Sequence, residues 1–299
     1  MFKRVLSLVV FAVMLPYFSF AQADRISGRV VDKETQEPIQ YASIGLKEEQ
    51  VGALTNEYGY FQIAMPEKNQ KDSLIVIALG FKRTAILVRK SDKNLEEIIL
   101  EVPKREYLLS GVKVEASKVK PIGLGARSNT PGDGMIQGMP GTQYAFYVKN
   151  DKGKKLGLVR TVSFFIGEHG FPREPFRIRI YAPDGNYSSP NSDLLTENVV
   201  VSAIKGGAWY TVDLTQYNIV APDEGFYVAM EWIVTGDKFY TTNFMDTYTP
   251  YGQILRPTFE FKESRTWNYT IGRGWSLITL ANNGMRYNAM IKAEVDMYK

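Results

Sequence analysis

The chain has 299 residues, of which 44% are hydrophobic and 23% are charged, a balance that excludes an intrinsically disordered protein. Its formal net charge of +4 is too small to indicate a nucleic-acid-binding surface. The chain contains no cysteine, which excludes disulfides, thiol catalysis and thiolate metal sites.

Residues 1–23 have the pattern of an export signal. Two basic residues precede an apolar run at positions 5–15, and small residues follow at a spacing typical of cleavage after Ala21 or Ala23. The apolar run is too short to predict a membrane anchor, and no second long apolar segment follows. We therefore expect an exported chain with no stable transmembrane segment after signal cleavage, located in the periplasm, on the outer-membrane surface or outside the cell.

Residues 24–102 combine short strand patterns with turns. The segments expected to form strands are RISGRVVD, YASIGL, YFQIAM, DSLIVIALGF, TAILV and EEIIL. In the first of them Ile26, Gly28 and Val30 share one face. DSLIVIALGF is more continuously apolar, which is typical of a central strand covered on both sides.

The stretch TNEYGYFQI, residues 55–63, could be a ligand loop or a turn. Gly59 directly precedes an alternating strand, and Asn56 lies three residues earlier. Asparagine initiates turns through its side chain, and glycine adopts positive φ without steric cost. A calcium loop would need oxygen ligands at alternate positions, where Tyr58 stands instead. We therefore predict a turn.

These segments together resemble a known domain family. The matching features are GRVVD at 28–32, EPI at 37–39, ASI at 42–44, TNEYGYF at 55–61 and GFK at 80–82. In this order they resemble the carboxypeptidase-regulatory-like domain, a transthyretin-like β-sandwich, over residues 26–100. The resemblance implies an accessory module, as found on peptidases, outer-membrane receptors and surface proteins, and it implies no catalytic residues.

A segment rich in glycine and proline separates two regions of β pattern. We expect residues 103–141 to form a linker and loop that partly join the following domain, residues 142–299. The loop has no G-x-G-x-x-G or G-K-[ST] pattern, so we expect no phosphate-binding cofactor site.

The region after residue 142 offers about eight strand candidates. They are QYAFYV, LVRTVSFFI, PFRIRIYA, NVVVSA, WYTVDL, EGFYVAMEWIV, KFYTTNF and YNAMIKAEV. Alternation in FRIRIYA places Arg177 and Arg179 outward, and alternation in GFYVAMEWIV places Glu231 on the face opposite Trp232. The pattern predicts an antiparallel jelly-roll-like sandwich. The stretch from PFRIRIYA to VAMEWIV also resembles a C-terminal β-sandwich region found beside carboxypeptidase-regulatory-like modules in exported bacterial proteins of unassigned function.

Few residues are suited to catalysis. His169, the only histidine, is expected on a solvated loop, and no nucleophile elbow or zinc-binding helix motif is present. A carboxylate-based glycoside hydrolase would need two facing acids. The acidic residues considered for such a pair are Glu168, Glu174, Asp223, Glu224, Glu231 and Asp246. We expect Glu231 on the polar face of a strand and the other five on solvated loops.

Aromatic residues between positions 238 and 275 form a candidate ligand platform. Five rings lie among polar residues, where they could stack on sugar rings or fill the edge of the sandwich core. These are Tyr248, Tyr251, Trp267, Tyr269 and Trp275. A structural calcium near Asp184, Asn186 and Asp193 is conceivable, but the spacing is not diagnostic, so we predict no metal.

The sequence therefore predicts an all-β protein with two sandwiches: a small transthyretin- or immunoglobulin-like one and a larger jelly-roll-like one. We expect a non-enzymatic interaction or structural module of a bacterial envelope, with no cofactor and with an envelope protein or a glycan as partner. The alternative is a carbohydrate-binding protein that uses the aromatic loops. A coplanar, exposed pair among the late rings would favour that alternative, and a carboxylate-based hydrolase comes third.

Overall fold

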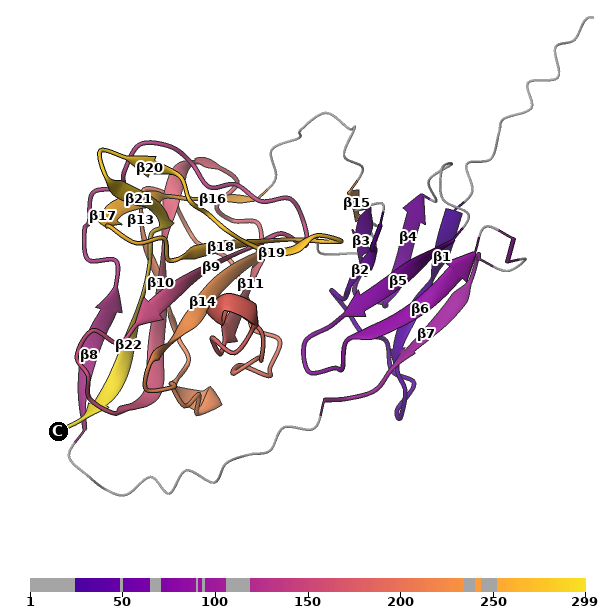
Figure 1. Ribbon diagram of the computed structural model, residues 1–299, viewed down its shortest axis with the longest axis horizontal. Coiled ribbons are helices and arrows are strands. Elements are labelled where there is room, and N and C mark those ends of the chain that lie inside the picture. Colours follow the sequence, from indigo (N-terminus) through magenta and orange to yellow (C-terminus); the bar gives the residue numbers. More distant parts are fainter. Residues whose placement is uncertain are drawn as a thin grey trace, which may run out of the picture.

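Two β sandwiches lie next to each other along the long axis of the molecule (Figure 1). The computed structural model describes residues 25–48, 51–64, 71–89, 91–92, 95–105, 119–233, 240–242 and 252–299. Nearly all regular elements in these ranges are strands, and the two exceptions are short 3-10 turns, η1 (Asn186–Ser188) and η2 (Thr215–Tyr217). The predicted all-β fold is thus confirmed. Within the same ranges no helix is long and apolar enough to cross a membrane.

The small sandwich packs a three-stranded sheet against a five-stranded sheet. The first has the order β4-β1-β7, with β1 (Arg25–Asp32), β4 (Tyr60–Ala64) and β7 (Ile98–Val102). The second has the order β15-β3-β2-β5-β6, with β15 (Tyr240–Thr242), β3 (Gly52–Leu54), β2 (Ser43–Leu46), β5 (Lys71–Ile77) and β6 (Thr84–Arg89).

Alternating side chains of this sandwich meet in one hydrophobic core. Ile26 and Val30 of β1 pack with Phe61 of β4 and with Leu74 and Val76 of β5, and all five are buried. Each apolar residue withdrawn from water contributes about 1.5–3 kcal/mol. The intervening residues of β5 are only half-buried, so the second face of this strand is less covered than its apolar sequence predicts.

The predicted turn at residues 55–60 is confirmed. The Asn56 Oδ1 atom accepts hydrogen bonds from the backbone N–H groups of Tyr58 and Tyr60, each at 3.0 Å. Gly59 has a φ of 77°, and a Cβ added there would lie 2.6 Å from the carbonyl oxygen of Val30. Only glycine therefore fits this position without strain.

The larger sandwich contains a six-stranded and a five-stranded sheet. The six-stranded sheet comprises, in order, β12 (Val200–Val201), β11 (Phe176–Tyr181), β14 (Gly225–Trp232), β9 (Gln143–Lys149), β18 (Thr266–Thr270) and β19 (Gly274–Leu277). The five-stranded sheet runs β13 (Ala208–Asp213), β10 (Leu156–Gly170), β22 (Ile291–Tyr298), β8 (Val119–Gly125), with β16 (Gln253–Leu255) also pairing with β10. A small third sheet contains β17 (Pro257–Phe261), β21 (Met285–Ala289) and β20 (Ala281–Asn282).

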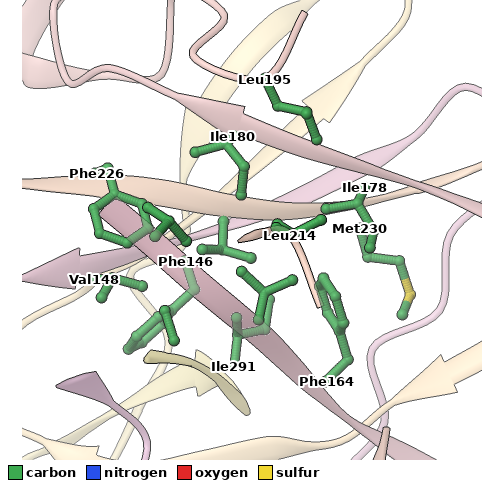
Figure 2. Close-up of a cluster of buried hydrophobic side chains, with 14 of the residues drawn as sticks. Phe146, Val148, Phe164, Ile178, Ile180, Leu195, Leu214, Phe226, Met230 and Ile291 are labelled. Carbon is green, nitrogen blue, oxygen red and sulfur yellow. The ribbon is translucent and has the colours of Figure 1, made fainter. Parts of the chain in front are cut away.

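The core of the larger sandwich lies between these two main sheets. Figure 2 shows Phe146, Ile178 and Phe226 of the six-stranded sheet facing Phe164 and Ile291 of the five-stranded sheet. All five side chains are fully buried. The alternate residues of FRIRIYA and GFYVAMEWIV therefore point inward as their alternation predicts. They are Phe176, Ile178, Ile180, Phe226, Val228, Met230 and Trp232.

Two segments pair differently from the sequence expectation. Residues 119–125, within the predicted linker, form β8 at the edge of the five-stranded sheet, where Pro121 lies opposite Asp296 of β22. An edge position suits Pro121, because proline has no N–H for a further ladder. The KFYTTNF segment, expected in the larger sandwich, supplies β15, which instead pairs with β3 of the small sandwich.

The tip of the β18–β19 hairpin forms a second contact between the sandwiches. Figure 1 shows this hairpin extending toward β2 and β3. Ile271 at the tip is buried against backbone of the small sandwich: a Cβ added at Gly52 would lie 2.1 Å from Ile271 Cγ2, and one at Gly45 would lie 2.9 Å from Gly272 N. Glycines at these two positions therefore allow the close approach.

Candidate functional site

A cleft of about 1200 Å³ lies between the two sandwiches. One wall comes from β2, β5 and the segments after β5 and β7. The other comes from β9, β11, the loop containing η1, and the β18–β19 hairpin. A much smaller pocket of about 230 Å³ lies elsewhere on the larger sandwich, beside Leu156 and Tyr298. The inter-sandwich cleft is therefore the candidate site.

The outer face of the six-stranded sheet provides the floor of this cleft. Strand register aligns Arg177, Glu231, Gln143, Tyr269 and Trp275 in one row across β11, β14, β9, β18 and β19. Side chains that alternate with the core positions on neighbouring strands must share the opposite face. Residues distant in the sequence are thus brought together by pairing.

Charged residues in and beside this row form a buried network. Arg177 donates to both carboxylate oxygens of Glu231, from Nε at 2.8 Å and from Nη2 at 2.9 Å. Arg179 donates to Glu231 Oε2 at 3.3 Å and to Asp193 Oδ1 at 2.5 Å. Arg177, Arg179 and Glu231 are at most 4% exposed. Both arginines point away from the core, as the alternation predicts. This face is nevertheless buried, because the small sandwich and the η1 loop cover it.

This network also joins the two sandwiches. Arg177 Nη2 donates to the backbone carbonyl of Tyr41 at 3.0 Å, and the Arg177 guanidinium lies 5.7 Å from the centre of the Tyr41 ring. Tyr41 and Leu54 of the small sandwich pack against Ile233 at the end of β14. Burial alone would lower the pKa of Arg179, but the neighbouring groups Asp193, Tyr181 and Glu231 together outweigh it and hold that pKa well above its usual value. Arg179 therefore remains charged.

Aromatic rings pack edge to face or at a tilt beside the network. Trp275 lies 5.6 Å from Tyr181 at an interplanar angle of 80°, and 5.3 Å from Tyr269 at 59°. The Tyr181 hydroxyl donates to Gln143 Oε1 at 2.6 Å. Burial raises the pKa of Tyr181 well above its usual value and, with help from the nearby Glu231 charge, raises the pKa of Tyr269 to about 12. The Tyr181 and Tyr269 hydroxyls are therefore neutral at neutral pH.

Because the pKa of Tyr269 is raised, the free energy of unfolding is expected to fall as the pH rises above 10. An unfolded tyrosine ionises near pH 10.0 and folded Tyr269 near pH 12, so its stabilising contribution is fully present below pH 10 and is lost as the pH rises to 12. We expect Tyr269→Phe to remove a slope of about 1.4 kcal/mol per pH unit from the free energy of unfolding in that window. Urea unfolding across the window measures this. Tyr187→Phe, at a 96% exposed position, is the control, and identical pH dependence in both variants would contradict the assignment.

The structure brings three of the five predicted platform residues to the cleft. Trp267, Tyr269 and Trp275 all line it, whereas Tyr248 and Tyr251 lie outside the described residues. Tyr269 is only 7% exposed, and its ring is tilted against Trp275. An exposed coplanar pair of Tyr269 and Trp275 is therefore absent, and Trp267 and Trp275 retain partial exposure within the cleft.

Several residues that the sequence reasoning did not assign to a site also line the cleft. From the larger sandwich these include Gln143, Arg179 and Tyr181, and from the small one Lys47, Arg83 and Arg105. The alternation of FRIRIY could have signalled Arg179 and Tyr181, since both share a face. No local pattern could have signalled the contribution of the small sandwich, because it depends on how the two domains dock.

The structure also places several of the other candidate residues for catalysis or metal binding. His169 lies at the exposed end of β10 and not on a loop, which corrects the prediction. Glu231 is bound by two arginines, and Asp184 accepts hydrogen bonds from the N–H and the hydroxyl of Ser192. Within the described ranges, no group of three metal-ligating residues of the Asp, Glu, His or Cys type is found. Asp246 lies outside those ranges.

The small sandwich, which provides one wall of the cleft, matches a known domain family. Residues 26–114 match the family model of the CarboxypepD_reg-like domain. The match confirms the resemblance seen in the motifs of residues 26–100. No curated protein matches the chain. The CarboxypepD_reg-like domain thus forms one wall of the cleft, and the larger sandwich forms the other wall.

Proposed function

We propose that this chain is a non-enzymatic, exported binding protein of a bacterial envelope. In this proposal the ligand lies between the two sandwiches, and the CarboxypepD_reg-like domain is a scaffold that closes one side of the site. One observation carries the proposal: the cleft of about 1200 Å³ is built by both domains and combines aromatic with basic side chains. Ligand sites occur preferentially at domain interfaces and are lined by aromatic residues with a few polar groups.

A carbohydrate is the ligand class that the lining favours over a protein partner. Trp267 and Trp275 present partly exposed rings, and Gln143, Asn186 and Asn191 lie around them as amide hydrogen-bonding groups. Flat rings can contact the apolar faces of sugars, while amides can bond their hydroxyls. A hydrolase has less support, because both Glu231 and Asp193 are engaged by arginine.

Binding of residues 24–299 to a broad glycan panel tests this function. We expect saturable binding that Trp275→Ala weakens about tenfold or more, as removal of a central aromatic contact does in other interfaces. Tyr58→Ala removes a ring that is 55% exposed on the small sandwich, away from the cleft, and should change nothing. Circular dichroism establishes that both variants are folded.

Two outcomes would count against the proposal. Equal binding by wild-type chain and Trp275→Ala would place the ligand outside the cleft. If no glycan binds, crosslinking in intact cells decides between a protein partner and a purely structural role. A crosslinked partner retained in Trp275→Ala would also reject the cleft as the site. Fractionation of the same cells checks the proposed export.

A further inference from the structure

We propose that the cleft takes an acidic oligosaccharide, whose carboxylate or sulfate groups contact basic side chains of the small sandwich while its sugar rings contact the aromatic floor. This inference rests on the proposed binding function and names its ligand class. The observations behind it are the sign of the charge in the cleft, its division between the walls, and the size and shape of the space.

The described lining of the cleft is rich in basic residues. Arg83, Arg105 and Lys47 come from the small sandwich, where Lys47 also pairs with Glu48 at 3.5 Å. Arg273 comes from the tip of the β18–β19 hairpin. The positive charge of Arg179 is already matched within the buried network, and the Asp184 carboxylate is bound by the neighbouring serine.

This positive excess is local, because the chain as a whole carries 36 basic and 32 acidic residues. A cleft with walls of one charge sign concentrates ligands of the opposite sign. Arginine in particular binds planar carboxylate and sulfate-like groups through paired N–H donors.

The two walls offer different chemistry. Basic groups come mainly from the small sandwich, and the rings of Tyr181, Trp267 and Trp275 come from the larger one. Arg83 lies close enough to Tyr269 to oppose part of the rise in the pKa of that tyrosine, so the two kinds of group meet across the cleft. A ligand that fits both walls carries anionic groups on one side and flat, weakly polar ring faces on the other. Acidic sugars have this combination.

The volume and the origin of the lining favour an oligosaccharide over a small molecule or a peptide. About 1200 Å³ exceeds the range of about 300–1,000 Å³ typical of small-molecule pockets. Extended peptides commonly add to an unpaired sheet edge through their backbone. Here the lining residues lie on β2, β5, β9, β11, β18 and β19 and in turns, and many of them carry aromatic, amide or basic side chains, which suits recognition through side chains.

Calorimetric titration of residues 24–299 with matched probes tests the inference. The probes are oligogalacturonides, the same oligosaccharides after reduction of their carboxyl groups, a sulfated galactan oligosaccharide, and an acidic glutamate peptide. We expect an acidic oligosaccharide to bind saturably and its neutral or peptide counterpart to bind at least about tenfold more weakly. Binding should weaken as the salt concentration rises, because salt screens exposed charges.

Variants locate the anionic contact. Arg83→Gln should weaken binding of the acidic oligosaccharide about tenfold and leave binding of the carboxyl-reduced form unchanged. Arg173→Gln, at an exposed basic position outside the cleft, is the matched control and should bind like the wild-type chain. Because Arg83 is exposed, its substitution is not expected to unfold the domain.

The outcomes separate this inference from the proposed function. Binding of neutral sugars as tight as that of acidic ones, lost in Trp275→Ala, would keep the cleft as a carbohydrate site and overturn the acidic ligand class. Tight binding of the glutamate peptide alone would overturn the oligosaccharide. Absence of binding to every acidic probe would overturn the inference, and absence of binding to the whole glycan panel would count against the proposed carbohydrate function as well.

Discussion

Replacement of Glu231 by glutamine is expected to lower the free energy of unfolding of the larger sandwich by about 3–5 kcal/mol. Both carboxylate oxygens of Glu231 accept from Arg177, and Oε2 also accepts from Arg179. Glutamine has nearly the same shape but no charge, and its NH₂ group cannot accept. The variant would leave an uncompensated guanidinium in a site from which water is excluded.

Tryptophan fluorescence during urea unfolding measures this effect on one domain. All four tryptophans, Trp209, Trp232, Trp267 and Trp275, belong to the larger sandwich, so their emission does not report the small one. Trp232 is fully buried next to Glu231 in sequence, which makes it a sensitive reporter. Fluorescence thus gives the stability of the larger sandwich within the intact chain.

A control variant and a rescue variant accompany this experiment. Glu294→Gln makes the same chemical change at an exposed position of β22 and should shift the free energy of unfolding by less than about 0.5 kcal/mol. Combining Glu231→Leu with Arg177→Met replaces the central pair by apolar groups and should recover part of the loss. A Glu231→Gln variant as stable as the Glu294→Gln variant would contradict the assigned role of the network.

Replacement of Ile271 by aspartate is expected to separate the two sandwiches at the hairpin tip without unfolding either. The β15–β3 pairing and the Arg177–Tyr41 contact would still connect them. Ile271 is 2% exposed and lies against the backbone at Gly52, where an added Cβ would come within 2.1 Å of it. A carboxylate cannot be hydrated in so narrow a contact, and burying it without a partner costs several kcal/mol. The hairpin tip should therefore leave the small sandwich.

Small-angle scattering and ligand binding together measure this separation. We expect a larger radius of gyration and binding in the cleft that is at least about tenfold weaker, since both walls supply contacts. Tryptophan fluorescence should show that the larger sandwich remains folded. Ile271→Ala should act in the same direction but less strongly, because it removes packing without introducing a charge.

Leu280→Asp is the matched control for this experiment. Leu280 is 66% exposed near the start of β20, so a charge there meets water and not the other domain. The control should keep the compact shape and the binding of the wild-type chain. An Ile271→Asp variant as compact as this control would show that the hairpin tip does not hold the domains together.

Much of the fold follows from local patterns in the sequence. The turn at residues 55–60 was predictable because Asn56 and Gly59 have conformational preferences that need no distant partner. Alternation in FRIRIY and GFYVAMEW identified the core-facing residues for a similar reason, since successive side chains of a strand point to opposite faces. The motifs of residues 26–100 were sufficient to recognise the first domain.

Some predictions from the sequence were wrong because one continuous strand pattern covered two separate strands. YNAMIKAEV reads as a single strand, yet the chain passes from β21 to β22 at Met290, and these strands belong to different sheets. Both parts are apolar and strand-like, and no glycine or proline marks the change. The KFYTTNF segment likewise reads as a strand but does not reveal that its partner is β3.

The fold class, the turn and the inward faces could be predicted from the residues alone, because these depend on side-chain size, polarity and spacing over a few residues. The burial of Arg177, Arg179 and Glu231 could not be predicted in this way, and neither could the wall of the cleft that the small sandwich supplies. The same holds for Tyr269, which is covered while Trp267 and Trp275 remain partly exposed. An outward-facing charge has the same local sequence pattern whether water or a second domain covers it. The partner that covers it is distant in the sequence, and its position depends on contacts made along the whole interface.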